Sequence, residues 1–274
     1  MRIGVYVFGL ASVAAGMMDL VWGEFEAAHQ PIQALSDHIP GVTILAYIAA
    51  IWLIAGGAAI LSRATVRAGA MALGIIYFIF AAFLFPRFYT APHFLGHRPG
   101  VYIGVLAGVG QQLILVVAAA IIYASWGARG KLSNSSLSQA AALIARWTFG
   151  LCSVVFGLGH LTGIHDVASM IPNWMPFGGS FWTVLTGIAF VLAGLAILSG
   201  ILDVLAARLL ALMLLIFSML VLAPMVFAYP HNHIAWGGNA YNLAAVGAAW
   251  IVADWLATGR QPAPNGEGPK TSQA

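Results

Sequence analysis

Two segments of the chain carry titratable side chains at corresponding positions. The segment "FGLASVAAGMMDLVWGEF" begins at Phe8 and the segment "FGLCSVVFGLGHLTGIHD" begins at Phe149, and they share several phenylalanine, glycine, leucine, serine and valine positions. The first copy has carboxylates where the second has imidazoles, and both groups transfer protons in enzymes. We therefore predict catalytic acid–base roles for four residues, which are Asp19, Glu24, His160 and His165.

A second pair of corresponding segments carries closely spaced histidines. In "PHFLGH", His93 and His97 are four residues apart and would share one face of a helical turn. In "PHNH", His231 and His233 are two residues apart and would share a face only in an extended chain. Imidazole ligands suit iron, copper or zinc. We therefore predict that a transition metal binds these four histidines, although the sequence contains no HExxH motif.

Aromatic residues gather near the same segments, and two interpretations of them remain open. Trp and Tyr are common at membrane–water interfaces, so these residues would form an interfacial belt. Alternatively, they would form the wall of a site for a quinone or another flat apolar ligand. On the second interpretation, the cofactor-binding residues are Trp22, Trp236 and Tyr241.

The composition excludes an ordinary soluble protein. Of the 274 residues, 61% are hydrophobic and only 7% are charged, whereas a soluble domain has about 25% charged residues. The net charge of +3 is too small to indicate a nucleic-acid partner. The single cysteine excludes an internal disulfide bond and a CxxC redox motif. The lipid bilayer is therefore the predicted environment of the chain.

Eight apolar stretches are long enough to cross a bilayer as helices, which takes about 20 residues each. They cover residues 3–22, 43–61, 68–86, 101–125, 147–163, 181–200, 205–226 and 239–257. The sequence predicts an all-α polytopic membrane protein whose eight transmembrane helices form two parallel four-helix repeats. The predicted parts are a first repeat at 1–126, a cytoplasmic linker at 127–146, a second repeat at 147–258 and a disordered tail at 259–274.

The basic residues predict the orientation of these helices. One membrane face has only Arg87 and Arg98, and the opposite face has the remaining lysines and arginines. Because cytoplasmic loops are enriched in Lys and Arg, we predict a multi-pass inner (plasma) membrane protein with cytoplasmic N- and C-termini. All eight histidines then fall on the extracytoplasmic face. Two of them, His29 and His38, are interpreted as solvated loop residues without a role in the site.

The four-helix unit resembles the DoxX-like membrane protein superfamily. The resemblance rests on the glycine-rich first helix "FGLCSVVFGLGHL", the proline-containing loop after it, the "AGLAIL" of the second helix and the proline that ends the third. It implies a redox or quinone-linked membrane subunit and assigns no catalytic residue. Most members have a single four-helix unit, so the fused duplication departs from their pattern.

These observations lead to one principal hypothesis about function. The chain is predicted to be an integral inner-membrane protein of a redox system, possessing an extracytoplasmic His/carboxylate pocket for a quinone-like ligand or a transition metal (Fe, Cu or Zn). Its partners would be the bilayer and an extracytoplasmic or membrane redox protein, and it would act as an oxidoreductase subunit. The alternatives are a small-solute or metal transporter, a metal-free enzyme acting on a lipid-like substrate, and a structural subunit.

Overall fold

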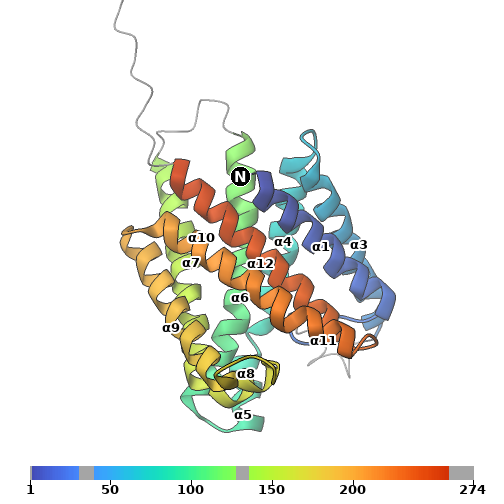
Figure 1. Ribbon diagram of the computed structural model, residues 1–274. Helices are drawn as coiled ribbons and strands as arrows, with labels where there is room; N and C mark the ends of the chain where they lie inside the picture. Colours follow the sequence, from blue (N-terminus) through green and yellow to red (C-terminus); the bar gives the residue numbers. More distant parts are fainter. Residues whose placement is uncertain (1, 31–39, 128–135, 259–274) are drawn as a thin grey trace, which may run out of the picture.

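The computed structural model describes residues 2–30, 40–127 and 136–258, and these residues form helices joined by short loops (Figure 1). Eight helical segments are long and apolar enough to cross a membrane, so the predicted all-α polytopic fold is confirmed. Helices are the expected form here because each one satisfies its backbone hydrogen bonds internally, away from water. The spanning helices are α1 (Arg2–Trp22), α3 (Val42–Leu61), α4 (Val66–Leu84), α6 (Pro99–Gly127), α7 (Ser136–Thr162), α9 (Gly178–Ser199), α10 (Asp203–Phe217) and α12 (His233–Thr258).

Four shorter segments complete the described part of the chain. The seventh span continues beyond α10 through a π-helical segment, η1 (Ser218–Leu222), and through α11 (Ala223–Ala228). Two short helices lie between spans, α5 (Arg87–Leu95) and α8 (Ile164–Met170). We call the membrane face at which α1, α4, α7 and α11 end and α12 begins the histidine face.

Two predicted boundaries differ from those of the helices. Helix α7 begins at Ser136, within the predicted linker, and α12 begins at His233, before the predicted start at residue 239. Helix α7 takes in polar residues from Ser136 onward, and α12 takes in His233 and two glycines before residue 239, and both sets lower the local hydropathy. The remainder of the linker and the predicted disordered tail, residues 128–135 and 259–274, lie outside the described residues.

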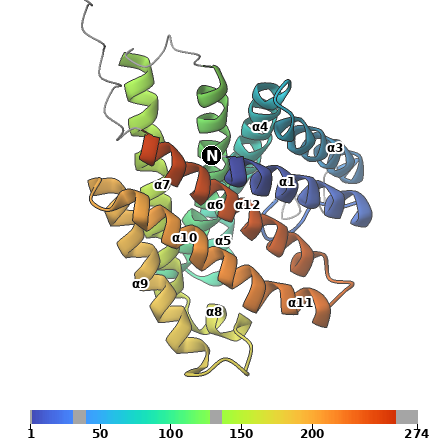
Figure 2. The same ribbon diagram turned by 45° about the horizontal axis from the view of Figure 1, so that its top comes forward.

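The two halves of the chain, α1–α6 and α7–α12, use the same order of helix contacts. In the first half α1 packs on α3, α3 on α4 and α4 on α6, and α7, α9, α10 and α12 pack in the same sequence. The halves are interlocked, because α1 packs along α12, and α7 packs along α6 (Figure 2). Helices α6 and α12 also touch each other at the centre. A side chain on α12 can therefore take part in a site whose other residues come from the first half.

Glycines allow the first two helices of each half to touch through their backbones. A Cβ atom on Gly57 of α3 would lie 2.7 Å from the carbonyl oxygen of Gly9 in α1. The corresponding Gly194 of α9 has the same relation to Gly150 of α7, again at 2.7 Å. Small residues at such crossings are typical of membrane helices, because van der Waals packing is their main source of association.

We expect Gly57→Ala and Gly194→Ala each to destabilise the protein by about 1–3 kcal/mol, because the added methyl group meets backbone that must move. The measurement is the thermal unfolding temperature of the purified protein in a mild detergent. Gly74→Ala on α4 is the matched control, since its new Cβ atom would lie 3.5 Å from Ala119. Equal unfolding temperatures for the three variants would contradict the proposed role of the glycine contacts.

Candidate functional site

Asp19 is a carboxylate buried inside the membrane-spanning part of α1. It has no exposed surface, and its Oδ2 atom accepts a hydrogen bond of 2.7 Å from Nε2 of Gln30. Its other oxygen, Oδ1, lies 3.6 Å from Nε2 of His233 on α12. A carboxylate at this depth is expected to face protein, and Asp19 does so.

His233 lies between a buried carboxylate and an exposed one. Its Nδ1 atom lies 3.5 Å from Oε1 of Glu24, whose side chain is 53% exposed. The imidazole stacks on the indole of Trp22, with ring centroids 4.9 Å apart and planes 4° apart. Gly23, with a φ of +67°, ends α1 in the left-handed region that favours glycine. The chain turn at Gly23 is therefore followed directly by Glu24, which meets the first residue of α12.

Glu26 and His29 form a second carboxylate–imidazole pair in the loop after α1. The Glu26 side chain is only 1% exposed, and its Oε2 atom lies 2.6 Å from Nδ1 of His29. The backbone N–H groups of Ala28 and His29 also donate to this carboxylate, at 2.9 and 2.7 Å. Burial alone would raise the pKa of Glu26, but the hydrogen bonds from His29 and these N–H groups hold its pKa below the ordinary value.

Residues from three other elements hold this loop in place. Gln112 of α6 donates from Nε2 to the carbonyl oxygen of His29 at 2.7 Å. Arg87 of α5 donates to the carbonyl oxygen of Ala27 at 3.3 Å. Gly237 of α12 lies directly against Glu26, because a Cβ atom there would overlap its side chain. The pair is therefore built into the contact between the two halves.

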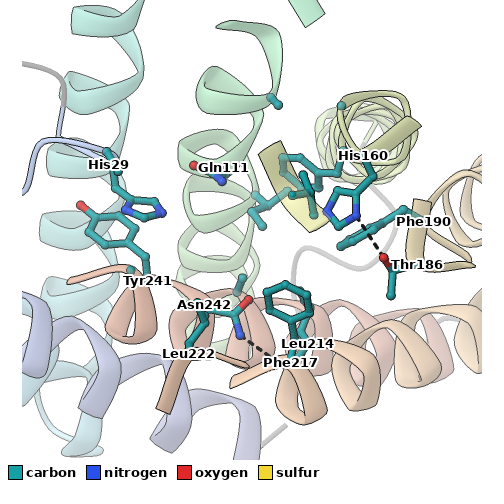
Figure 3. Close-up of a pocket in the computed structure, with 18 of the residues that line it drawn as sticks. His29, Gln111, His160, Thr186, Phe190, Leu214, Phe217, Leu222, Tyr241 and Asn242 are labelled. Carbon is teal, nitrogen blue, oxygen red and sulfur yellow. Dashed lines mark hydrogen bonds between the residues drawn. The ribbon is translucent and has the colours of Figure 1, made fainter. Parts of the chain in front are cut away.

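A cavity of about 430 Å³ lies beside this cluster, between the two halves. Its walls come mainly from α6, α7, α9, α10 and α12, and most of the lining residues are apolar. Figure 3 shows His29 and His160 on opposite sides of the cavity, with Gln111 of α6 between them. The other polar lining residues include Thr186, Tyr241 and Asn242. Such a cavity suits an apolar ligand with a few hydrogen-bonding groups.

Hydrogen bonds fix the orientation of both imidazoles at the cavity. Thr186 donates its hydroxyl to the carbonyl oxygen of Trp182 at 2.8 Å, so its oxygen accepts from Nδ1 of His160 at 3.0 Å. The ionised Glu26 carboxylate accepts in the same way from Nδ1 of His29. A neutral imidazole held in this way has its proton on Nδ1 and an acceptor at Nε2. Both imidazoles line the cavity, so each could accept a hydrogen bond from a ligand that donates.

An irregular turn in the seventh span borders the cavity. At η1, Ala223 donates its N–H to the carbonyl oxygen of Ser218, five residues back. Ser218 donates to Asn239 at 2.6 Å, and Asn242 donates to the carbonyl oxygen of Leu214 at 2.8 Å. These contacts from α12 satisfy polar groups beside the irregular turn. Short π-helical segments of this kind are frequent at functional sites.

The structure brings together part of the predicted site. Asp19, Glu24, His233 and Trp22 meet at one place, and Tyr241 stacks on His29, with ring centroids 4.5 Å apart. The other predicted residues lie elsewhere. His160 lines the cavity from the second half. Trp236 donates to the carbonyl oxygen of Pro230. The remaining four histidines are exposed, and these are His93, His97, His165 and His231.

The expected geometry of the histidine pairs was wrong. Gly96, with a φ of +84°, ends α5 before His97, so His93 and His97 do not share a helical face. His97 instead lies 2.8 Å from the hydroxyl of Tyr102. His231 lies in a turn and His233 begins α12, so this pair is not extended. Within the described ranges, no three His, Cys, Asp or Glu side chains are grouped as a metal site requires, and the four-histidine metal site stays an unsupported prediction.

Sequence reasoning missed Glu26, His29, Gln30 and Gln112. The signal for the first two was present, because the spacing in "EAAH" places a carboxylate and an imidazole one helical turn apart. Their burial depends on α6 and α12, which lie far away in the sequence. His38, the other histidine interpreted as solvated, lies outside the described residues.

Comparison with known proteins gave no relative of this chain. No family model matches it, and neither the curated proteins nor the solved structures gave a match. The arguments about its function therefore rest on its own residues.

We expect Glu26→Gln to lower the stability at pH 7 by about 1.5–3 kcal/mol, the value of hydrogen bonds to a charged group. A carboxyl whose pKa is lowered on folding stabilises the protein above its ordinary pKa, which is 4.5 for Glu26. That contribution is lost as the pH falls below this value and through the lowered pKa of the folded protein.

The thermal unfolding temperature, measured in detergent from pH 7 to pH 3, checks this expectation. The difference between wild type and Glu26→Gln should shrink as the pH falls. Asp166→Asn removes an exposed carboxylate on the same face and serves as the control. A difference that stays constant with pH would show that Glu26 is not ionised in the folded protein.

Proposed function

We propose that the protein binds a quinol-like ligand, an apolar ring system with hydroxyl groups, in the cavity between its halves. The observation that carries this proposal is the cavity itself, an apolar space with an acceptor imidazole on each side. A para-quinol has hydroxyl groups at opposite ends of its ring, and each one donates to Nε2 of one histidine. The resemblance of the sequence to DoxX-like proteins points to the same class of ligand.

The Glu26–His29 pair supports a role in proton removal from this ligand. A carboxylate that holds Nδ1–H of an imidazole leaves Nε2 as a base and stabilises the imidazolium that forms. Oxidation of a quinol releases two protons and two electrons. In the proposed reaction His29 and His160 accept the protons, and a haem or iron–sulfur protein of the membrane or the extracytoplasmic space accepts the electrons.

A second candidate function depends on the same pair. A metal-free enzyme acting on a hydroxylated lipid would use His29 as its base and the cavity for the apolar part of its substrate. The burial of Glu26 beside His29 fits this activity equally well. The chemical identity of the bound ligand distinguishes the two functions, since only the first needs a redox-active ring.

We also propose that the protein lies in the inner membrane with both termini in the cytoplasm. The arginines and lysines outside the histidine face support this orientation. We expect a C-terminal green fluorescent protein fusion to be fluorescent and a C-terminal alkaline phosphatase fusion to be inactive. The opposite result would place the histidine face in the cytoplasm.

We expect Ala245→Leu to weaken quinol binding at least about tenfold, a change of about 1.4 kcal/mol, because the larger side chain fills the cavity. His160→Phe should weaken it about two- to tenfold by removing one neutral hydrogen bond. The measurement is the Kd of a short-chain ubiquinol for the detergent-purified protein under anaerobic conditions, read from tryptophan fluorescence.

The control for this experiment is Ala124→Leu, an exposed position on the same kind of helix. Mass spectrometry of the organic extract of the wild-type protein should detect a quinone that is depleted in Ala245→Leu. A hydroxylated lipid in its place would favour the second function. An unchanged Kd in folded Ala245→Leu and His160→Phe would rule out the cavity as the quinol site.

A further inference from the structure

We propose that Asp19 is a proton-binding site inside the membrane that exchanges protons with the aqueous phase through Glu24 and His233. This site is distinct from the cavity, because none of the three side chains lines it. The inference goes beyond ligand binding, since it gives the protein a titratable carboxyl group in the bundle with a defined route to water.

The first observation is that one imidazole lies between an exposed and a buried carboxylate. Nδ1 of His233 faces Glu24 at 3.5 Å and Nε2 faces Asp19 at 3.6 Å. These distances exceed hydrogen-bond length by a few tenths of an ångström. The Glu24 side chain is half exposed, and a movement of a few tenths of an ångström would bring its carboxyl into contact with the ring.

The second observation is that the buried ends of this route lack hydrogen-bond partners. Among the described residues, neither Oδ1 of Asp19 nor Nε2 of His233 has one, although both atoms are fully buried. A buried acceptor and a buried nitrogen left without partners are costly in a folded protein. The two atoms lie 3.6 Å apart, and a proton on either one makes the pair a donor and an acceptor, so the pair is suited to hold a proton.

The polar groups around Asp19 determine which of them can neutralise its negative charge. The polar groups that act on it are His233 and Tyr241 of α12, Gln30 and Glu26 of the loop, and Tyr77 of α4. Helix α3, which also packs on α1, contains no charged residue. In the described surroundings His233 is the only group that can carry a positive charge beside Asp19, so a proton there neutralises the carboxylate directly. His233 in turn is faced by Asp19, Glu24 and Glu26.

The transfer is balanced as a relay through the imidazole ring. A proton from water binds Glu24 and passes to Nδ1 of His233, which becomes an imidazolium ion. The proton on Nε2 then moves to Oδ1 of Asp19, which leaves a neutral imidazole and a neutral carboxyl group. The route ends at Asp19, because its other oxygen is held by the amide of Gln30, and an amide N–H is not a proton relay.

Infrared difference spectroscopy of the full-length protein in detergent tests the proton site. Lowering the pH should produce C=O stretching bands of protonated, buried carboxyl groups, and one of these bands belongs to Asp19. This band should be absent in Asp19→Asn, whose amide oxygen can still accept from Gln30, and present in Glu26→Gln, which removes another buried carboxyl. A spectrum that is the same in Asp19→Asn as in the wild type would overturn the proposal. The band should be unchanged in Ala245→Leu, so that a failure of the cavity as a ligand site is distinguished from a failure of the proton site.

The rate at which this band appears after a pH jump tests the route. We expect His233→Phe, which keeps a flat ring against Trp22, and Glu24→Gln each to slow its appearance about tenfold or more. Added imidazole should restore the rate in His233→Ala, and Asp166→Asn should leave it unchanged. Unchanged rates in Glu24→Gln and His233→Phe would overturn the route, and Glu24→Gln keeps the test decisive if His233→Phe fails to fold.

Discussion

The burial of two carboxylates in an apolar bundle is the constraint on which the rest of the site depends. An ionised group without partners in such a place costs several kcal/mol, so Asp19 and Glu26 both require polar neighbours. Residues 23–30, the loop after α1, provide these neighbours. Gln30 forms a hydrogen bond with Asp19, and His29 forms one with Glu26. Gly237 of α12 leaves room for this loop, because a Cβ atom there would overlap the Glu26 side chain.

The interlocked helices explain why the site is shared between the halves. Because α1 packs along α12, the first half obtains an imidazole and an aromatic ring, His233 and Tyr241, from the last helix of the second half. The same arrangement leaves the cavity at the meeting of α6, α7, α10 and α12, with His29 in its wall. His29 thus touches both the carboxylate cluster and the cavity, and it connects Glu26 to the cavity wall.

The fold could be predicted from the sequence further than the site could. The length and hydropathy of each span are enough to predict a membrane-spanning helix. Asp19 could be singled out because a carboxylate within an apolar run is expected to face protein. Repeat symmetry was a poorer guide, because it paired Asp19 with His160, and the two lie in different surroundings. The burial of Glu26 could not be predicted, since it depends on Gly237 and Gln112, which hydropathy does not place beside it.

The difference between the halves is itself informative about function. If the second half had a carboxylate at the position of His160, as the first half has at Asp19, the bundle would contain two such negative charges. Each charge would need a buried partner. Replacement of the second carboxylate position by His160 removes that cost, because a neutral imidazole needs only the hydroxyl of Thr186. The bundle therefore holds its buried acids on one side of the cavity and a neutral acceptor on the other. The two sides of the cavity therefore differ in polarity, with a carboxylate behind His29 and a hydroxyl behind His160.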